Sequence, residues 1–463
     1  MPQTIIEKIW DEHQIADLGD GTCLIYIDRV FLHERTGSVA LKGLEASNRQ
    51  VRNPEQAFCT MDHIVDTTPG RNDNTRMPGG TAFIQTTRKA ALAAGINLFD
   101  LDDQRQGIAH VISPEQGIAL PGVTLVCPDS HTGTLGGLGA LAWGIGSTEA
   151  EHALATKTLV IKKPKTMRVT FNGELRNGVT AKDMILTLIG RHTASGGIGY
   201  AIEFTGNAIS NLPIEARLTL CNMTIEFGAW SGLVAPDEKT FEYVQGRPYA
   251  PDDSQWDQAV SYWKSLQTDS DAIFDKEITV DCSEIVPQVS WGTSPMHEVG
   301  IDRRVPNPID EPDESLRTSM ERALDYMGLE PGTPMEGIPI DAAFIGSCTN
   351  SRVSDLRAAA EILKGHKVAE GVKAICVPGS GLVKQAAEAE GIDKIFTDAG
   401  FEWRESGCSM CFYAGGESFG LEERVISSTN RNFENRQGPR TRSHLERGSA
   451  PDRGQGPPGH HLS

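Results

Sequence analysis

The chain has 463 residues, which is enough for two to four lobes that each enclose a hydrophobic core. Its composition of 39% hydrophobic and 23% charged residues, with a mean hydropathy of −0.30, is typical of a soluble globular protein. The 62 acidic and 43 basic residues give a net charge of −19, which argues against nucleic acid or an anionic membrane as the main partner. A local group of arginines can still bind a small anionic substrate.

The first residues of the sequence do not have the pattern of a targeting signal. The first residues, MPQTIIEKIWDEHQIAD, have acids where a signal peptide needs a basic head and an apolar run. No apolar run reaches the length needed to span a bilayer. The nine cysteines are scattered and odd in number, which fits a reducing compartment better than a disulfide framework. We therefore expect a cytoplasmic protein.

Short β-branched runs alternate with helical patterns along the chain. Strands are predicted at 124–127, 167–171, 341–346 and 373–377, and helices at 180–190 and 357–365. The first of these helices opens with a capping signature at Thr180 and Asp183. Strands that alternate with helices indicate an α/β fold with mostly parallel sheets.

Two stretches rich in turn formers look like connections, at 245–256 and 299–316. Residues 446–463, ERGSAPDRGQGPPGHHLS, are rich in Gly and Pro and are expected to be disordered. These features suggest one main region at 1–445, with approximate lobes at 1–165, 166–298 and 299–445, followed by the tail.

Three cysteines have the arrangement of metal ligands. Cys348 follows the strand predicted at 341–346, and ligands of open α/β sheets bind at the carboxyl ends of strands. Cys408 and Cys411 form a C-x-x-C pair, which lets two thiolates converge on one centre. The other six cysteines are interpreted as buried structural residues.

The three cysteines leave three kinds of site open. Zinc needs a fourth ligand, which His366 or His444 can offer. A redox dithiol is a second interpretation of C-x-x-C. A [4Fe–4S] cluster with only three cysteines is the third, and its open iron would act as a Lewis acid.

Several polar residues lie on turn-rich segments. Each histidine alone is more often structural than catalytic, but two have an adjacent Asp, and carboxylate–imidazole pairs suit proton transfer. Arginines downstream of the C-x-x-C can hold a carboxylate, although a solvated basic turn is the simpler interpretation. The candidates are Asp62, His63, His110, Asp129, Ser130, His131, Glu203, Arg431 and Arg436.

Taken together, these motifs resemble the aconitase superfamily, and within it the branch that isomerises isopropylmalate. The resemblance extends from about residue 4 to residue 445. The motifs that carry it are YIDR (26–29), TMDH (60–63), SPEQG (113–117), DSHT (129–132), TLCNMTIEFGA (219–229), LVAPDE (233–238), GSCTNSR (346–352), VPGSG (377–381), GCSMC (407–411) and TNRNFE (429–434).

The resemblance implies three α/β/α lobes around one [4Fe–4S] cluster with three cysteine ligands, Cys348, Cys408 and Cys411. Asp62 and His63 match the pair that protonates the departing hydroxyl. His110 with Asp129, and His131 with Glu203, match supporting imidazole–carboxylate pairs. Ser130, Arg431 and Arg436 match substrate-binding residues, and Asn350 and Asn430 are expected beside the cluster.

The implied reaction is a hydro-lyase isomerisation of 2-isopropylmalate to 3-isopropylmalate through 2-isopropylmaleate, a step of leucine biosynthesis. The catalytic base of the superfamily lies on a swivelling domain that this sequence does not contain, so a small subunit is the expected partner. Alternatives are a related hydro-lyase of homoaconitase or citramalate/maleate type, an iron sensor that binds RNA, and a zinc-stabilised binding module. The −19 charge disfavours the sensor.

The sequence departs from the family in two places. After Leu445 the family continues with an alanine-rich helix, whereas this chain has the Gly/Pro-rich tail. After Cys411 the chain reads FYAGG, where LAMN is common. Both departures lie outside the ligand positions.

Overall fold

The computed structural model describes residues 1–413 and 416–446. They form two compact units, each assembled from several stretches of chain. The first unit comprises residues 1–64, 79–174 and 195–282, and the second comprises 65–78, 175–194 and the chain from 283 onward. Residues 447–463 of the expected tail lie outside the described part.

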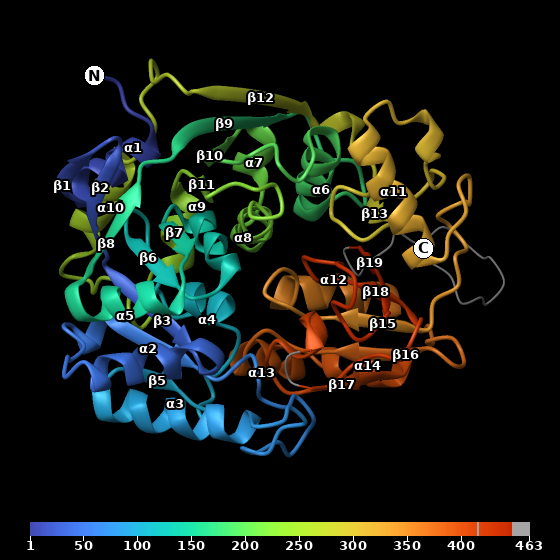
Figure 1. Cartoon of the computed structure of the whole chain (residues 1–463), viewed down its shortest axis with the longest axis horizontal. Coiled ribbons are helices and arrows are strands. Elements are labelled where there is room, and N and C mark those ends of the chain that lie inside the picture. Colours follow the sequence, from blue (N-terminus) through green and yellow to red (C-terminus); the bar gives the residue numbers. More distant parts are fainter. Residues whose placement is uncertain (414–415, 447–463) are drawn as a thin grey trace. The chain divides into compact units, whose positions relative to one another are not determined.

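The first unit contains a parallel sheet with strand order β5-β4-β3-β6-β7. Most of its strand residues are buried, as expected for a parallel sheet covered on both faces. The helix α2 packs against α3 and α5 (Figure 1). The bounds are β3 (Arg29–His33), α2 (Glu34–Ala46), η1 (Pro54–Gln56), β4 (Ala57–Thr60), α3 (Gly80–Ala94), β5 (Asn97–Phe99), α4 (Ala109–Glu115), β6 (Thr124–Cys127), η2 (Ser130–Leu138), β7 (Leu141–Gly144) and α5 (Ser147–Thr156).

The same unit has a second parallel sheet, with strand order β11-β10-β9-β12, and a small antiparallel sheet, β1-β2-β8. Their elements and the remaining helices are α1 (Ile5–His13), β1 (Gln14–Gly19), β2 (Thr22–Tyr26), β8 (Thr158–Lys162), β9 (Lys165–Asn172), β10 (Tyr200–Thr205), α7 (Asn207–Asn211), α8 (Ile214–Asn222), β11 (Ser231–Val234), α9 (Glu238–Val244), α10 (Trp256–Ser265) and β12 (Lys276–Asp281). A short turn, η3 (Cys282–Glu284), spans the boundary between the units.

The second unit contains a parallel sheet with strand order β17-β16-β15-β18-β19 and a hairpin of β13 and β14. The helices α12, α13 and α14 pack against one another. The segments that lead to β18 and β19 contain no α-helix within the described residues. The bounds are α6 (Ala181–His192), β13 (Gln288–Ser290), β14 (Glu298–Gly300), η4 (Pro308–Asp310), α11 (Glu314–Met327), β15 (Ala342–Ile345), α12 (Val353–Leu363), β16 (Lys373–Cys376), α13 (Gly381–Ala389), α14 (Ile392–Ala399), β17 (Phe401–Trp403), η5 (Ser409–Cys411), β18 (Arg424–Ser427) and β19 (Arg442–Leu445).

The expected α/β class with mostly parallel sheets is confirmed. The four predicted strands correspond to β6, β9, β15 and β16, and the helix predicted at 180–190 is α6. Its capping signature is also present, because the Asp183 Oδ2 accepts hydrogen bonds from the Thr180 backbone N and hydroxyl at 2.7 Å each. Each expected lobe contributes one parallel sheet, although the two compact units do not follow the predicted lobe boundaries.

Some expected connections hold and others contain regular structure. The chain between α9 and α10 is irregular, as predicted for 245–256. Residues 299–316 contain the end of β14 and the start of α11. Within the two described ranges, none of the helices is long and apolar enough to cross a membrane.

Aromatic stacking fills the core beside the first parallel sheet. Phe31 on β3 is 1% exposed and stacks on Phe58 and Phe99, with ring centroids 5.9 and 6.5 Å apart. We expect Phe31→Ala to lower the free energy of unfolding by about 3–5 kcal/mol, because it removes transfer free energy and leaves a cavity. Chemical denaturation of the full chain measures this loss. Leu92→Ala on the exposed side of α3 is the control, and equal effects of the two variants would contradict the packing argument.

A partly buried ion pair joins α1 to the first parallel sheet. The Nε2 of His13 lies 2.7 Å from the Asp28 Oδ2, which also accepts a hydrogen bond from the Thr124 backbone N at 2.8 Å. Burial opposes both charges, but the pair prevails: the hydrogen bond and charge of Asp28 raise the pKa of His13, and His13 lowers the pKa of Asp28. Each partner therefore stabilises the charged form of the other.

This pair makes the stability of the chain depend on pH. The contribution of His13 is complete below its ordinary pKa of 6.5 and is lost as pH rises through the raised pKa. The contribution of Asp28 is present above its ordinary value of 3.8 and is lost as pH falls through the lowered pKa. We expect His13→Gln to cost about 1 kcal/mol at pH 6 and clearly less at pH 9. Urea denaturation at the two pH values tests this, and a pH-independent difference would refute it.

Candidate active site

The first unit gathers polar side chains where its first sheet reverses strand order. β3 and β6 are neighbours, but the chain builds outward from β3 through β4 to β5, and then from β6 to β7. His33 ends β3, Asp62 and His63 follow β4, and Asp129 follows β6. Because all these strands are parallel, their carboxyl ends meet at one edge, which is where open α/β sheets bind ligands.

His63 lies between two carboxylates. Its Nδ1 is 2.6 Å from the Asp62 Oδ1, and its Nε2 is 3.1 Å from the Asp129 Oδ2. Asp62 is fully buried, and its Oδ2 accepts a hydrogen bond from the Ala109 backbone N at 3.0 Å. The arrangement orients both ring nitrogens and favours the protonated imidazole.

Asp129 is the common partner of three histidines. Besides His63, its carboxylate lies 3.2 Å from the His110 Nε2 and accepts a hydrogen bond from the His131 backbone N at 2.8 Å. The Ser130 hydroxyl lies 3.4 Å from the His131 Nδ1. The predicted grouping of Asp62, His63, His110, Asp129, Ser130 and His131 is therefore present in the first unit.

In this group, nearby histidines outweigh the unfavourable burial of the two aspartate charges. Burial alone would raise the pKa of Asp129, but the charge and hydrogen bond of His110, with hydrogen bonds to His131 and His63, hold it well below its usual range. Burial likewise opposes the charge of Asp62, and His63 more than offsets it, so the pKa of Asp62 is lowered. Both carboxylates are ionised at neutral pH and can stabilise imidazolium ions.

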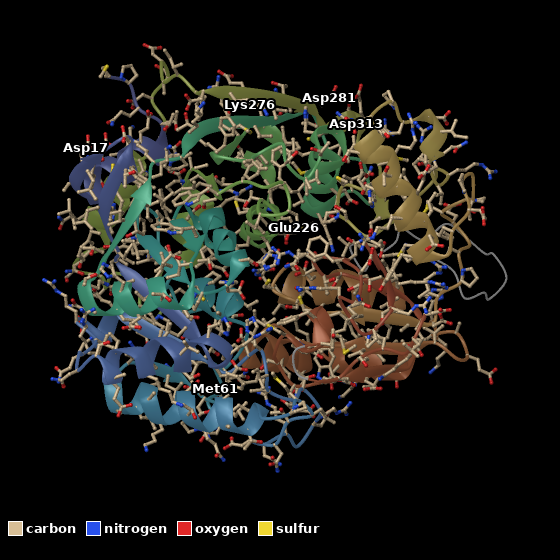
Figure 2. All side chains as sticks on the ribbon, viewed as in Figure 1. Asp17, Met61, Glu226, Lys276, Asp281 and Asp313 are labelled. Atoms are coloured by element: carbon tan, nitrogen blue, oxygen red, sulfur yellow. The ribbon has the colours of Figure 1, made fainter. Side chains whose placement is uncertain are left out.

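The predicted pairing of His131 with Glu203 is wrong. Glu203 lies within β10, where its Oε2 accepts a hydrogen bond from the Thr268 hydroxyl at 2.6 Å, and burial raises its pKa to about 6. The partner of His131 is Glu226, labelled in Figure 2, whose Oε1 lies 3.0 Å from the Nε2. The tripeptide Ile-Glu-Phe occurs at both positions, so the local sequence does not distinguish the two glutamates.

The three predicted ligand cysteines all lie in the second unit. Its sheet reverses strand order between β15 and β18. Cys348 follows β15, Asn430 follows β18, and Cys408 and Cys411 flank the short turn η5. All three thiols are buried, at 6–7% exposure. Ser347, directly before Cys348, has a φ of 81°, a strained left-handed conformation of the kind that clusters at ligand sites.

Polar groups converge on the sulfur atoms. The Ser347 hydroxyl lies 3.2 Å from the Cys411 Sγ and 3.9 Å from the Cys348 Sγ. The Asn430 Nδ2 donates to the Cys348 Sγ at 3.4 Å, and the Arg436 Nη2 lies 3.7 Å from the Cys411 Sγ. Donors of this kind stabilise thiolates, so the donor set fits a metal or cluster held by sulfur.

The loop that carries Asn430 is held by a buried lysine. Lys182 on α6 is 1% exposed, and its Nζ donates to the carbonyl oxygens of Ser428, Thr429 and Glu446 at 2.8, 2.6 and 3.0 Å. Three acceptors match the three N–H groups of an ammonium ion. Lys182 therefore fixes the end of β18 next to the cysteine site.

The remaining candidates differ in their placement. Arg436 also stacks over Phe412, with 4.8 Å from the guanidinium carbon to the ring centroid, whereas Arg431 lies over Phe433 at 5.9 Å. The Asn350 Nδ2 donates to the Asp355 Oδ1 at 2.9 Å. The Asn430 amide contacts a ligand sulfur, as expected for a residue beside the cluster.

The zinc interpretation loses one proposed ligand. His444 has its Nδ1 2.7 Å from the Ser290 carbonyl oxygen and its Nε2 3.0 Å from the Arg424 guanidinium. His366 is exposed, unlike the three cysteines. All nine cysteines are described, and none forms a disulfide.

Sequence reasoning missed several residues of these two clusters. Glu226 lies inside the motif TLCNMTIEFGA, and its local sequence gives no sign of its distant partner. His33 and Glu34 come at the end of a strand and precede no metal-like spacing, so their position at the carboxyl edge of β3 was the available signal. Lys182 was hidden in a helix whose pattern indicated only packing.

These features define a class of protein. A model of the aconitase family (aconitate hydratase) matches residues 7–448. The chain belongs to the aconitase family, whose members carry an iron–sulfur cluster, in agreement with the three buried cysteines.

Comparison with individual proteins is more specific. The chain is 55% identical over 443 residues to a protein described as 3-isopropylmalate dehydratase large subunit 1 from Bradyrhizobium diazoefficiens, and the match covers 96% of this chain and 92% of that relative. A solved structure, holo aconitase X from Thermococcus kodakaraensis, aligns with 92% of this chain and 89% of its own at a TM-score of 0.47 and 12% identity.

The corrected pairing can be tested with two matched variants. Glu226→Gln removes the charge that faces His131, and we expect hydro-lyase activity to fall about 10- to 100-fold. Glu203→Gln removes a carboxylate that contacts Thr268, and we expect activity within about threefold of the unmodified protein. Steady-state kinetics with the assembled enzyme measure both, and the opposite order of effects would restore Glu203 as the partner.

Proposed function

We propose that this chain is the large subunit of a hydro-lyase that isomerises 2-isopropylmalate to 3-isopropylmalate through 2-isopropylmaleate, in leucine biosynthesis. The observation that carries the proposal is the 55% identity, over 96% of the chain, to a relative described as 3-isopropylmalate dehydratase large subunit. The reaction removes hydroxide from C2 and a proton from C3, and then returns hydroxide to C3 and a proton to C2. No oxidant or reductant is consumed.

In this proposal Cys348, Cys408 and Cys411 hold one [4Fe–4S] cluster. Three buried thiols with polar donors at the sulfurs, and no disulfide, support it. When bound, such a cluster with one iron open supplies a Lewis acid for the hydroxyl and carboxylate of the substrate. Asn430 and Arg436 would stabilise thiolate charge at Cys348 and Cys411.

His63 is the proposed acid. Hydroxide is a poor leaving group, and a proton delivered to its oxygen lets it depart as water. The carboxylates of Asp62 and Asp129, one at each ring nitrogen, favour the imidazolium that holds this proton. In the second half of the reaction, the neutral imidazole takes the proton back from water.

The surrounding residues have supporting roles. His110 and His131 contact the Asp129 carboxylate, and Glu226 orients His131. They fix the position of the Asp129 carboxylate, whose negative charge stabilises the protonated form of His63. Ser130, Arg431 and Arg436 are the proposed substrate contacts, because a hydroxyl and two guanidinium groups suit a dicarboxylate.

The catalytic base is proposed to come from a second polypeptide, a small subunit. No side chain in the described clusters is an evident base for the C3 proton beyond the histidine network already used. The assembled enzyme is expected to be cytoplasmic, where a reducing environment preserves free thiols and a cluster.

Anaerobic co-expression with a small subunit tests the proposal. The absorbance of the maleate-type alkene formed from 2-isopropylmalate reports turnover, and iron and sulfide analysis reports the cluster. We expect activity from the pair, none from the chain alone, and loss of both iron and activity in Cys408→Ala.

Cys376→Ala is the matched control, because Cys376 is also buried in the same unit but ends β16 and contacts no ligand sulfur in the hydrogen bonds described above. We expect it to keep its iron. A folded, iron-loaded pair that does not turn over 2-isopropylmalate would move the assignment to a sister substrate. Zinc in place of iron and sulfide would overturn it.

A further inference from the structure

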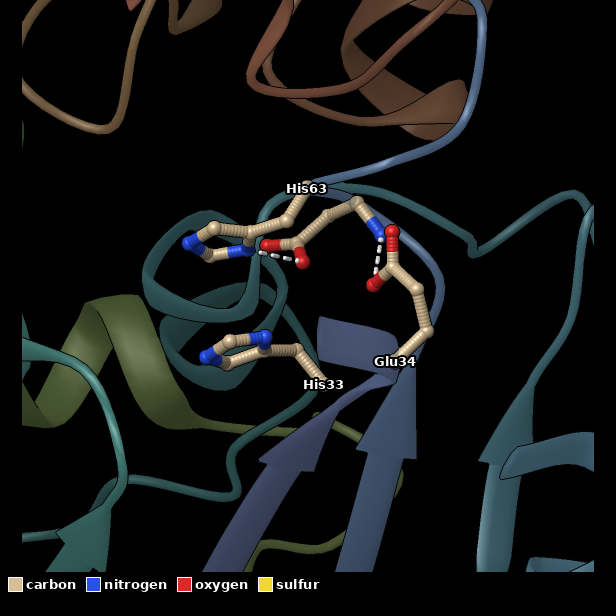
Figure 3. Close-up of side chains that lie close together, drawn as sticks. His33, Glu34 and His63 are labelled. Carbon is tan, nitrogen blue, oxygen red and sulfur yellow. Dashed lines mark hydrogen bonds and ion pairs between the residues drawn. The ribbon is translucent and has the colours of Figure 1, made fainter. Parts of the chain in front are cut away.

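Four polar side chains of the first unit lie close enough to bind one metal ion. The ligand atoms of His33, Glu34, Asp62 and His63 all lie within 4.8 Å of one another, and the four residues are buried. Figure 3 shows the His33 and His63 rings one above the other, with Glu34 beside them. Two imidazoles and two carboxylates resemble a metal site. The hydrogen bonds of the carboxylates give a second explanation for the same group.

The carboxylate oxygens already have partners. The Glu34 Oε2 accepts a hydrogen bond from the Asp62 backbone N at 3.0 Å, and the Oε1 accepts one from the Ile64 backbone N. The Asp62 Oδ1 pairs with the His63 Nδ1, and its Oδ2 accepts the Ala109 backbone N. Every carboxylate oxygen of the two acids therefore has a donor within the protein, and an amide left without its acceptor would cost about 1–3 kcal/mol. These hydrogen bonds account for the four side chains without a metal ion.

The two bonds made by Glu34 fix the backbone on both sides of His63. Glu34 is fully buried and begins α2 directly after β3, so its carboxylate is anchored to a central strand. Burial, and then the charge of Asp62, raise its pKa. The two Glu34 oxygens accept hydrogen bonds from the backbone amides of residues 62 and 64. These bonds fix the position of the His63 backbone and therefore the direction of its side chain.

His33 covers one face of the His63 ring. The two ring centroids are 3.8 Å apart and the planes differ by 12°. The His33 Nε2 lies 3.1 Å from the Pro128 carbonyl oxygen, a bond that requires the proton on this nitrogen. Burial, and then the charge of His63, lower the pKa of His33 to about 4, so it is neutral at physiological pH. A neutral ring can lie on a protonated one without charge repulsion, and it excludes water from that face.

We propose that His33 and Glu34 are positioning residues for His63: Glu34 fixes the backbone around it, and His33 fixes the plane of its ring and shields it. The role of His63 as the acid rests on the proposed function, but the positioning itself does not. Both residues come from the end of β3, so one rigid strand aims the proton donor. The charged groups that face His63 from neighbouring segments are Asp62 and Asp129, and behind Asp129 lie His110 and His131.

The shielding can be measured without turnover. Slow exchange of the ring Cε1 hydrogen for deuterium modifies protonated imidazoles that solvent can reach, and peptide mass spectrometry of the full chain gives the rate of this modification at each histidine. We expect His33→Asn to speed modification of His63 several-fold and His33→Phe, which keeps an aromatic face, to leave it near the unmodified rate. His366 is the exposed control, and its rate should not change. Equal rates at His63 in all three proteins would overturn the shielding.

Kinetics of the assembled enzyme then test positioning. We expect His33→Asn and Glu34→Gln to lower kcat about 10- to 100-fold with KM within about twofold, as for a misaimed acid, and His33→Phe to restore most of the loss. A raised KM with equal defects in His33→Asn and His33→Phe would mean that the nitrogens of His33 bind substrate, and would overturn the proposal. If the unmodified complex does not turn over, the proposed function fails, and the modification rates still decide the positioning.

Discussion

Both clusters of functional side chains depend on one constraint, the reversal of strand order in a parallel sheet. At such a point two neighbouring strands send their chains in opposite directions, so no connection crosses the gap between their carboxyl ends. In the first unit the reversal lies between β3 and β6, and in the second between β15 and β18. His33 and Asp129 flank the first, and Cys348 and Asn430 flank the second. The topology thus creates the space, and short loops put polar residues into it.

Buried charged side chains hold the loops at these points. Glu34 binds the amides on both sides of His63, and Lys182 binds three carbonyl groups at the end of β18. Burial raises the pKa of Glu34 and lowers the pKa of Lys182 to about 7, so the hydrogen bonds to the backbone of the functional loops offset only part of the cost of burying each charge. The same hydrogen bonds fix the backbone of the loops beside His63 and at the end of β18. Without these hydrogen bonds, the backbone of both loops would have more freedom to move.

The same balance governs the histidine network. Asp62, Asp129 and Glu226 face His63, His110 and His131 in a buried setting, and the lowered pKa values of Asp62 and Asp129 report that the pairs outweigh desolvation. His33 is the exception, because it contacts no carboxylate through its described hydrogen bonds and stays neutral. Because the His33 ring is neutral, it can cover one face of the His63 ring without charge repulsion. The network therefore separates residues that carry charge from a residue that shapes the site.

Much of this could be predicted from the sequence, where the signal is local. The C-x-x-C spacing places Cys408 and Cys411 on one turn, the strand before Cys348 puts that thiol on a loop, and the capping residues Thr180 and Asp183 start α6. Adjacent pairs such as Asp62 and His63 also interact as their spacing suggests. Only the tertiary structure decided the distant partners: Glu226 instead of Glu203 beside His131, His33 over His63, and Lys182 beneath the Asn430 loop. The physical reason is that sequence period and spacing fix contacts within a turn or a strand, whereas strand order decides which carboxyl ends become neighbours.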